Sequence, residues 1–271
     1  MFVESNAAIE NAPQAPPAPR SSVTVALPSR LVPPGGPVVV PATWYLVCKR
    51  VADVGVALLL MVLTAPVAFV ACLLVKLTSR GPMLYSQTRV GRGGRPFTIW
   101  KIRSMYHNCE ATSGAMWSRK GDPRVMPLGR FLRRTHIDEL PQLWNVLKGD
   151  MSLVGPRPER PEFVPQLEAA IPRYRERLLV LPGVTGLAQI HLGADVDLPG
   201  VERKLAMDLY YVKNLGFWMD ARIVLATVVH VIKPYVADKW FFRLTPQKCA
   251  EALNRSSSCG STKDEGRRTK E

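Results

Sequence analysis

The most constraining feature of this chain is an almost wholly apolar stretch that runs from Val54 to Val75. About 20 consecutive apolar residues are enough for a helix to cross the hydrocarbon core of a bilayer. Pro66 lies in the middle of this stretch, and a proline inside a helix removes one hydrogen bond and kinks the axis. We therefore expect residues 44–78 to form a membrane-associated helix–break–helix with its break at Pro66.

Basic residues flank both ends of the apolar stretch, with Lys49 and Arg50 before it and Lys76 and Arg80 after it. A helix that spans a bilayer usually concentrates positive charge on its cytoplasmic side. Charge at both ends instead favours a re-entrant segment that enters and leaves through the same leaflet. A kinked spanning helix fits the composition almost as well, so composition leaves both topologies open.

The 271-residue chain carries a formal net charge of +14 and a sequence pI of about 9.9, which predicts acidic partners. Nucleic acid is disfavoured, because the sequence has a long apolar segment but no basic helix, zinc finger or RNA-stacking motif. Anionic lipid or a phosphorylated substrate is the preferred partner. The five cysteines are scattered singly, which is typical of free thiols in a reducing compartment and not of a disulfide framework or a zinc site.

Charged residues gather in the segment from Gly129 to Glu159. Adjacent carboxylates, Asp138 and Glu139, follow Arg133 and its neighbouring arginine. Ordinary helix capping explains an acidic pair by itself. Here, however, the pair is accompanied by arginines, by the proline-stiffened turn Gly155–Glu159 and by a membrane segment. This combination predicts a site for a phosphate-bearing substrate at a membrane surface.

The carboxylate pair is expected to lie at the start of a helix. Pro141 has no backbone N–H and is tolerated near a helix start, and the apolar residues beyond it recur at helical spacing. Either Thr135 or Asp138 would be the N-cap residue. The unpaired amides and the helix dipole favour negative charge there, so the carboxylates stay ionised and a phosphate can bind beside them.

The rest of the sequence predicts a mainly helical α+β fold with a small β-hairpin over residues 84–103. Gly91–Arg95 supplies the hairpin turn, and it is not a P-loop because no Gly-Lys-Ser/Thr follows. Lys101 and Arg103 share one face of the second strand. Further along we expect a loop with a short helix over 106–127, an amphipathic surface helix without chemistry over Val164–Arg177, a tight turn over Pro182–Gly186, and helices over 201–214 and 217–232.

The helix over 217–232 is apolar on most faces but short for a membrane span. Trp218 and the later run Trp240–Phe242 favour an interfacial helix lying on the membrane, and an ordinary core helix is an equal alternative. Residues 1–43, rich in proline and alanine, and the polar residues 245–271 are expected to be disordered tails. Residues 79–244 would then form the main folded domain, and we expect no second domain before the membrane segment.

Six segments together resemble the bacterial sugar transferase family, the monotopic polyprenyl-phosphate phosphoglycosyl transferases that start cell-surface glycan synthesis. They follow one another within about residues 44–234 and are Ser79–Gly91, Trp100–Met105, Leu132–Leu143, Asn145–Glu159, Pro182–Gln189 and Asp208–Asn214. The resemblance implies a re-entrant membrane helix and a catalytic domain that faces the cytosol at the inner membrane. It also implies transfer of sugar-1-phosphate from a UDP-sugar to polyprenyl (undecaprenyl) phosphate with release of UMP, as the first membrane step of surface polysaccharide synthesis.

The resemblance also assigns roles to individual residues. Asp138 would be the nucleophile that forms a covalent aspartyl-phosphosugar, and Asp138 and Glu139 would be the ligands of a Mg²⁺ ion. Because an anion must attack a negatively charged phosphoryl centre, cationic groups are needed around it. The candidates for substrate and phosphate binding are Arg133 and Arg157 first, then Lys101 and Arg103, and then Gln189.

One departure from the family pattern follows Gln189. Where the family often has an Asn-Gly-Arg-like segment, this chain has Ile190-His-Leu-Gly-Ala-Asp195, so the sugar does not follow from the resemblance. Three alternatives to this function are a glycosyl transferase that releases UDP, a non-catalytic membrane scaffold for glycan-assembly enzymes, and a membrane-tethered nucleic-acid binder with salt-sensitive binding. Downstream glycosyltransferases and a second copy of the chain are further partners to consider.

Overall fold

The computed structural model describes residues 43–111, 114, 116–118, 121–192, 197–232 and 244–253. Helices dominate this part of the chain, as the sequence predicts. The helices are α1 (Thr43–Thr78), α2 (Pro127–Arg134), α3 (Gln142–Lys148), α4 (Val164–Ala170), α5 (Leu187–His191), α6 (Leu198–Lys213) and α7 (Phe217–Ile232). The strands are β1 (Leu84–Val90), β2 (Pro96–Ile102), β3 (Ser152–Val154) and β4 (Gly183–Thr185), and the 3₁₀ turns are η1 (Arg92–Gly94), η2 (Ile137–Glu139) and η3 (Tyr174–Leu179).

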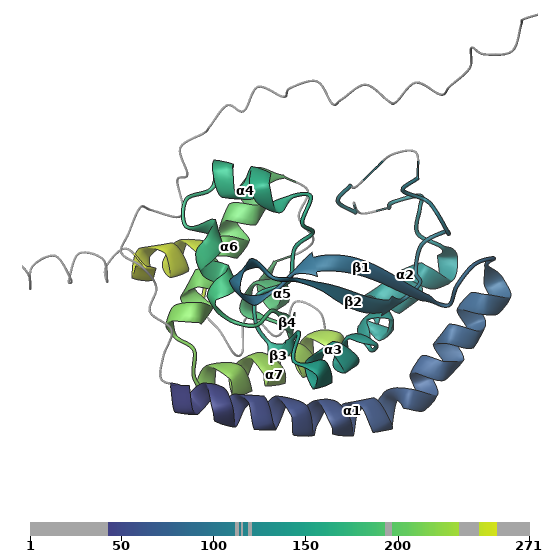
Figure 1. Cartoon of the computed structure of the whole chain (residues 1–271), viewed down its shortest axis with the longest axis horizontal. Coiled ribbons are helices and arrows are strands. Elements are labelled where there is room, and N and C mark those ends of the chain that lie inside the picture. The colour runs from purple at the N-terminus through teal and green to yellow at the C-terminus, as the bar shows by residue number, and fades with distance from the viewer. Residues whose placement is uncertain are drawn as a thin grey trace, which may run out of the picture.

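Helix α1 is continuous over 36 residues and passes through Pro66, so the interruption expected at this proline is wrong. The helix bends instead, and Figure 1 shows it running along one side of the domain and curving toward its C-terminal end. A proline removes one hydrogen bond, which allows a bend without ending the helix. Among the described helices, α1 alone is long and apolar enough to cross a membrane, and only 11% of its most apolar window is buried.

Both halves of α1 pack against the same domain. In the first half Ala57 is buried against Ile99 of β2 and Val146 of α3, and in the second half Val75 is buried against Leu132 of α2. The large apolar side chains on the opposite side of the helix are exposed, among them Leu58, Leu59, Val62, Leu63, Phe69 and Val70. Burial of one stripe leaves a continuous apolar surface facing outward.

Two arginines fasten the two ends of α1 to the domain. Arg50 donates to the carbonyls of Val146 and Leu147 at 2.6 and 2.9 Å, which satisfies the C-terminal end of α3. At the other end, Arg103, which directly follows β2, donates to the Ser79 carbonyl at 2.8 Å and to the carbonyl of the next residue. A cation at a helix C-terminus satisfies carbonyls that have no partner within the helix.

The predicted hairpin is confirmed. Strands β1 and β2 pair antiparallel from Leu84↔Ile102 to Val90↔Pro96, and η1 forms the connection. The free edge of β2 is bound by a side chain, because Asn145 of α3 donates to the Thr98 carbonyl at 2.7 Å and accepts from the Trp100 amide at 3.3 Å. Asn145 is fully buried, and it sets the position of the hairpin relative to α3.

A second, two-stranded sheet forms where the sequence predicts only a tight turn. Strand β4 lies within the segment Pro182–Gly186 and pairs parallel with β3. The two backbones approach closely at Gly155 and Gly183, where a Cβ atom on either residue would collide with the backbone of the other strand. Glycine is required at both positions for this reason.

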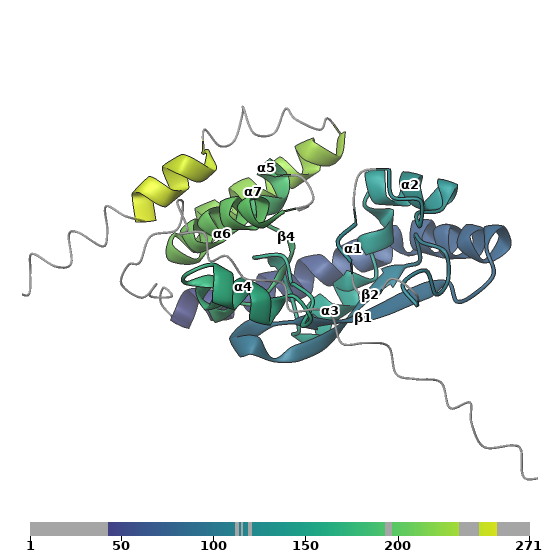
Figure 2. The ribbon, with the colours of Figure 1, turned by 90° about the horizontal axis from the view of Figure 1, so that it is seen from above.

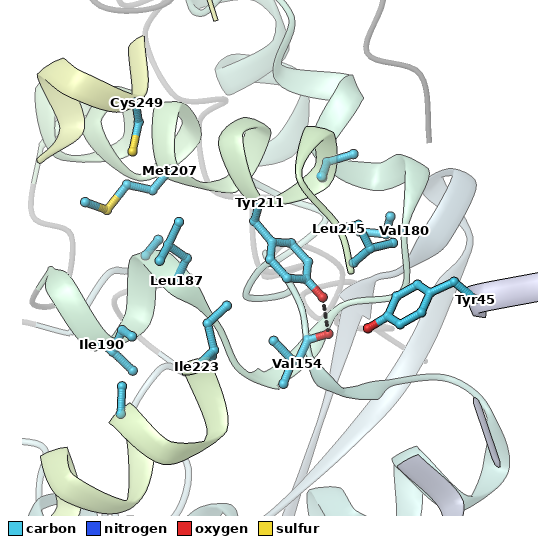
Figure 3. Close-up of a cluster of buried hydrophobic side chains, with 13 residues drawn as sticks. Tyr45, Val154, Val180, Leu187, Ile190, Met207, Tyr211, Leu215, Ile223 and Cys249 are labelled. Atoms are coloured by element: carbon cyan, nitrogen blue, oxygen red, sulfur yellow. Dashed lines mark hydrogen bonds between the residues drawn. The ribbon is translucent and has the colours of Figure 1, made fainter. Parts of the chain in front are cut away.

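Helices α5, α6 and α7 surround the largest buried cluster (Figure 3), which also receives Val154 from β3 and Tyr45 from α1. Figure 2 shows these three helices grouped on one side of the hairpin. The predicted helices over 201–214 and 217–232 are confirmed as α6 and α7. Helix α7 buries Ile223 and Ala226 but exposes 65% of Phe217 and 75% of Trp218.

Three other predictions need correction. The helix expected over Val164–Arg177 is divided into α4 and η3, because Pro172 cannot donate a helix hydrogen bond and Arg173 is left-handed with φ 63°. The described residues between 106 and 126 contain no helix. Residues 246–253 are helical, and Cys249 and Leu253 are buried, so the C-terminal tail does not begin at residue 245.

The predictions for the tails and the cysteines can be compared with the structure only where their residues are described. The N-terminal tail, apart from Thr43 at the start of α1, lies outside them, as do Trp240–Phe242 and residues 254–271. The four described cysteines, Cys48, Cys72, Cys109 and Cys249, are free thiols, as predicted.

Candidate active site

The carboxylate pair lies in η2, between α2 and α3. His136 adopts a left-handed conformation with φ 58° and turns the chain from the end of α2 into η2. The predicted N-cap is wrong, because Pro141 occupies that position of α3 and neither Thr135 nor Asp138 caps it with a side chain. Thr135 instead ends α2, where its hydroxyl donates to the Phe131 carbonyl at 2.9 Å. The pair nevertheless lies directly before α3, as the sequence indicates.

Glu139 is held by two cations from distant parts of the chain. Its Oε1 atom lies 2.7 Å from Nζ of Lys101 on β2 and 2.8 Å from a guanidinium nitrogen of Arg157. Burial alone opposes ionisation of Glu139, but Arg157 and Lys101 outweigh it and hold the pKa of this carboxyl well below its usual range. Glu139 is therefore an anion at neutral pH, and it fixes both cations at the site.

Asp138 is buried, with 5% of its surface exposed, yet its carboxylate forms no hydrogen bond or ion pair with any described residue. Burial raises the pKa of Asp138, and the neighbouring charge of Glu139 raises it further, while Lys101, Arg133 and Arg157 lower it. A buried carboxylate without a partner costs free energy. The Asp138 oxygens are not among the fully buried atoms that lack a partner, so the carboxylate keeps some contact with solvent and is accessible to a ligand.

Arg133 approaches the carboxylate pair from α2. Its Nε atom donates to the Ser104 hydroxyl at 2.8 Å and one terminal nitrogen donates to the Ser118 hydroxyl at 2.9 Å. Helix α2 can come this close because Gly129 packs directly against the Ser104 carbonyl, which a Cβ atom would strike. Arg133 has neutral partners only, so its charge is available to an anion, and it already lowers the pKa of Asp138.

Two predicted site residues are placed elsewhere. Arg103 binds backbone carbonyls at the end of α1 and does not contact the carboxylate pair. Gln189 lies in α5, where its amide donates to the Val184 carbonyl at 3.0 Å and its buried Oε1 atom has no hydrogen-bond partner among the described residues. The structure therefore brings together Asp138, Glu139, Lys101, Arg133 and Arg157.

Sequence reasoning missed two groups that shape the site. Asn145 fixes β2, and with it Lys101, against the helix that follows Glu139. Arg177, expected on a surface helix, is buried and donates to the Arg157 carbonyl at 2.7 Å. An isolated Asn or Arg in an amphipathic pattern carries no signal of such a contact, because the partner is a backbone carbonyl far away in the sequence.

Comparison with known proteins gives this site a context. A sequence model of the family described as bacterial sugar transferase matches residues 44–234, which is most of the chain. The chain belongs to the bacterial sugar transferase family. The match begins in α1 and includes the carboxylate pair, the hairpin and all seven helices up to α7.

Three members of the family illustrate the similarity. The UDP-glucose:undecaprenyl-phosphate glucose-1-phosphate transferase of Caulobacter vibrioides is 45% identical over 197 residues, 72% of this chain and 73% of that protein. The UDP-N-acetylgalactosamine-undecaprenyl-phosphate N-acetylgalactosaminephosphotransferase of Aeromonas hydrophila is 42% identical over 73% of this chain, which spans only 46% of that relative. The exopolysaccharide production protein PSS of Rhizobium leguminosarum bv. phaseoli is 42% identical, over 68% of this chain and 94% of that protein. The first two names carry different sugars, so the similarity does not specify the sugar.

Proposed function

We propose that this chain is a phosphoglycosyl transferase that moves sugar-1-phosphate from a UDP-sugar to a polyprenyl phosphate such as undecaprenyl phosphate, releasing UMP. The observation that carries the proposal is the buried Asp138 carboxylate, which is influenced by the charges of Lys101, Arg133 and Arg157 but has no hydrogen bond or ion pair with a described residue. A scaffold gains nothing from a desolvated, unpaired carboxylate, whereas a nucleophile has to be free to bond with its substrate. The names of the relatives agree with this class of reaction.

The residues divide the reaction into two displacements. A carboxylate oxygen of Asp138 attacks the phosphorus that bears the sugar, and the bond from that phosphorus to the UMP oxygen breaks. An oxygen of the polyprenyl phosphate then attacks the aspartyl-phosphosugar, and the bond to Asp138 breaks, which restores the carboxylate. Arg157 and Arg133 would grip the phosphate oxygens, because a guanidinium offers several donors in one plane. Glu139 holds both Arg157 and Lys101 in place, and its negative charge offsets part of their positive charge.

A Mg²⁺ ion fits this donor set. Asp138 and Glu139 are adjacent carboxylates in η2, and the described residues contain no larger group of metal-binding side chains. Mg²⁺ is commonly bound by one or two carboxylates together with substrate phosphate oxygens. When bound, it would neutralise charge on the diphosphate of the donor and make the phosphorus more electrophilic.

We further propose that α1 is re-entrant and that the catalytic domain faces the cytosol at the inner membrane. Arg50 and Arg103 tie the two ends of α1 to one domain, and that domain carries the charged site, which has to stay in water. Both ends of the helix therefore belong on the same side of the membrane, with the exposed apolar stripe between them inside the leaflet. The exposed Phe217 and Trp218 support an interfacial position for α7.

Cysteine labelling tests this topology. Cys48 is exposed near the start of α1 and Arg80 is exposed just beyond its end. With the other cysteines replaced by Ser, we expect a membrane-impermeant maleimide to label neither Cys48 nor an introduced R80C in intact spheroplasts, and to label both after lysis. Labelling of either site from the periplasmic side would contradict the re-entrant topology.

Nucleotide release tests the reaction. Purified membranes containing the protein would receive a panel of UDP-sugars with undecaprenyl phosphate and Mg²⁺. We expect UMP with at least one donor and none after EDTA. Without the acceptor, we expect release to stop after about one turnover as Asp138 becomes modified, and mass spectrometry would detect the sugar-phosphate on that peptide. Release of UDP would identify a glycosyl transferase instead, and no nucleotide with any donor would contradict the proposal.

A further inference from the structure

The turn that carries Arg157 has no regular secondary structure, yet four of its five backbone carbonyls accept a hydrogen bond. Each of the carbonyls from 156 to 159 accepts a hydrogen bond from a different partner. The donors, in order, are the Gly183 amide at 2.9 Å, Arg177 at 2.7 Å, Arg89 at 3.1 Å and the Val90 amide at 2.9 Å. Arg157 is therefore mounted on a rigid segment, although 41% of its side chain is exposed.

Two residues on one face of α6, Asp208 and Tyr211, support this turn. Asp208 and Tyr211 are three residues apart, so their side chains are neighbours on the helix surface. The Tyr211 hydroxyl lies 3.0 Å from the Val154 carbonyl, immediately before the turn (Figure 3). It also lies 2.8 Å from Oδ1 of Asp220, so these two acceptors share its single proton. Tyr211 is 1% exposed, so it is a fixed point at the entry to the turn.

Asp208 acts through Arg177. The Arg177 guanidinium is bound to Asp208 Oδ2 by two nitrogens, at 3.0 and 2.8 Å, and one of these nitrogens also donates to the Arg157 carbonyl. A third nitrogen donates to the Tyr174 hydroxyl at 2.9 Å. Both members of the ion pair are buried, at 6% and 3% exposure. Asp208 thereby fixes the orientation of the group that holds the backbone of Arg157.

We propose that Asp208 and Tyr211 are positioning residues for Arg157, an inference that rests on the proposed function for its catalytic consequence. Helix α6 binds the turn at Val154 through Tyr211 and at Arg157 through Asp208 and Arg177. Because the backbone of Arg157 is held in place, its guanidinium reaches Glu139 and the substrate phosphate from a fixed position. A buried ion pair is weak evidence for stability as such. Here it orients the guanidinium that donates a hydrogen bond to the Arg157 carbonyl.

Hydrogen exchange tests the positioning without any substrate. In the intact protein, Tyr211→Phe removes one hydroxyl and keeps the buried ring, while Asp208→Asn removes the charge that orients Arg177. We expect both variants to exchange the backbone amides within residues 155–160, all but the two prolines, about tenfold faster than wild type. Tyr210→Phe is the matched control on the same helix, and we expect it to exchange as wild type does. Unchanged exchange of this peptide in Tyr211→Phe would overturn the inference.

A double-mutant cycle tests the action through Arg157. We expect Tyr211→Phe to lower kcat/KM for nucleotide release about tenfold in wild type and less than twofold in the Arg157→Ala background, because the positioned group is then absent. An equal loss in both backgrounds would show that Tyr211 acts elsewhere and would overturn the inference. If wild type releases no nucleotide with any donor, the proposed function fails, while the exchange experiment still decides whether α6 holds the turn.

Discussion

Replacing Asp138 with Asn should abolish transfer while leaving the protein at least as stable as wild type. Removal of a nucleophile lowers kcat by more than about 10⁴-fold in enzymes that form a covalent intermediate. Because Asp138 has no hydrogen bond or ion pair with a described residue, only its longer-range attraction to Lys101, Arg133 and Arg157 is lost with its charge. We expect UMP release and labelling of the Asp138 peptide to disappear together.

The stability half of this prediction follows from the raised pKa of Asp138, which is caused first by burial and then by Glu139. A carboxyl whose pKa is higher in the folded state destabilises the fold once it is ionised. Asp138→Asn should therefore raise or preserve the Tm at pH 7, and the difference from wild type should vanish in acid, where the carboxyl is protonated. Asp150→Asn, at the other end of α3, is the matched control and should retain activity. A lower Tm in Asp138→Asn would contradict the assignment of Asp138 as an unpartnered nucleophile.

Glu139→Gln should have the opposite signature and lose both activity and stability. The substitution releases Lys101 and Arg157, which lie 2.7 and 2.8 Å from the Glu139 carboxylate. Breaking a largely buried ion pair from one side costs about 3 kcal/mol, because the remaining charges lose their partner. We expect a fall in kcat/KM of about 100-fold, since the phosphate-binding cations lose their fixed positions.

The pH dependence distinguishes this effect from a general packing defect. The pKa of Glu139 is held well below its usual value in the fold, because Arg157 and Lys101 outweigh the effect of burial. Its stabilisation is therefore complete above the unfolded pKa of about 4.3 and is lost as pH falls through the lower, folded pKa. The Tm difference between wild type and Glu139→Gln should be full at pH 7 and should shrink below about pH 4. Glu162→Gln, whose carboxylate is 51% exposed against Arg160, is the control and should change little. A difference that is independent of pH would contradict the prediction.

The elements that can be predicted from the sequence are those whose pattern lies within one segment. The apolar run of α1, the alternation and glycine-rich turn of the hairpin, and the helical spacing of α6 and α7 were all readable because each pattern lies within one segment. The acidic pair beside arginines was readable for the same reason, since its members are neighbours in the chain. Errors occurred where a single residue overrides the pattern, as with Pro172 between α4 and η3, or where a short strand such as β4 depends on a distant partner.

Which charged side chains contact one another follows from the three-dimensional arrangement of the chain. Lys101 and Arg157 lie 38 and 18 residues from Glu139 along the chain, and nothing local distinguishes Lys101, which reaches the dyad, from Arg103, which serves the end of α1. The difference arises because Asn145 fixes the position of β2 against α3, while α1 ends beside Arg103. A hydrogen bond to a backbone carbonyl depends on which distant segment folds next to the donor. A pattern of side chains along the sequence does not contain this information. The sequence therefore determined which residues have the chemistry, and the fold decided which of them act together.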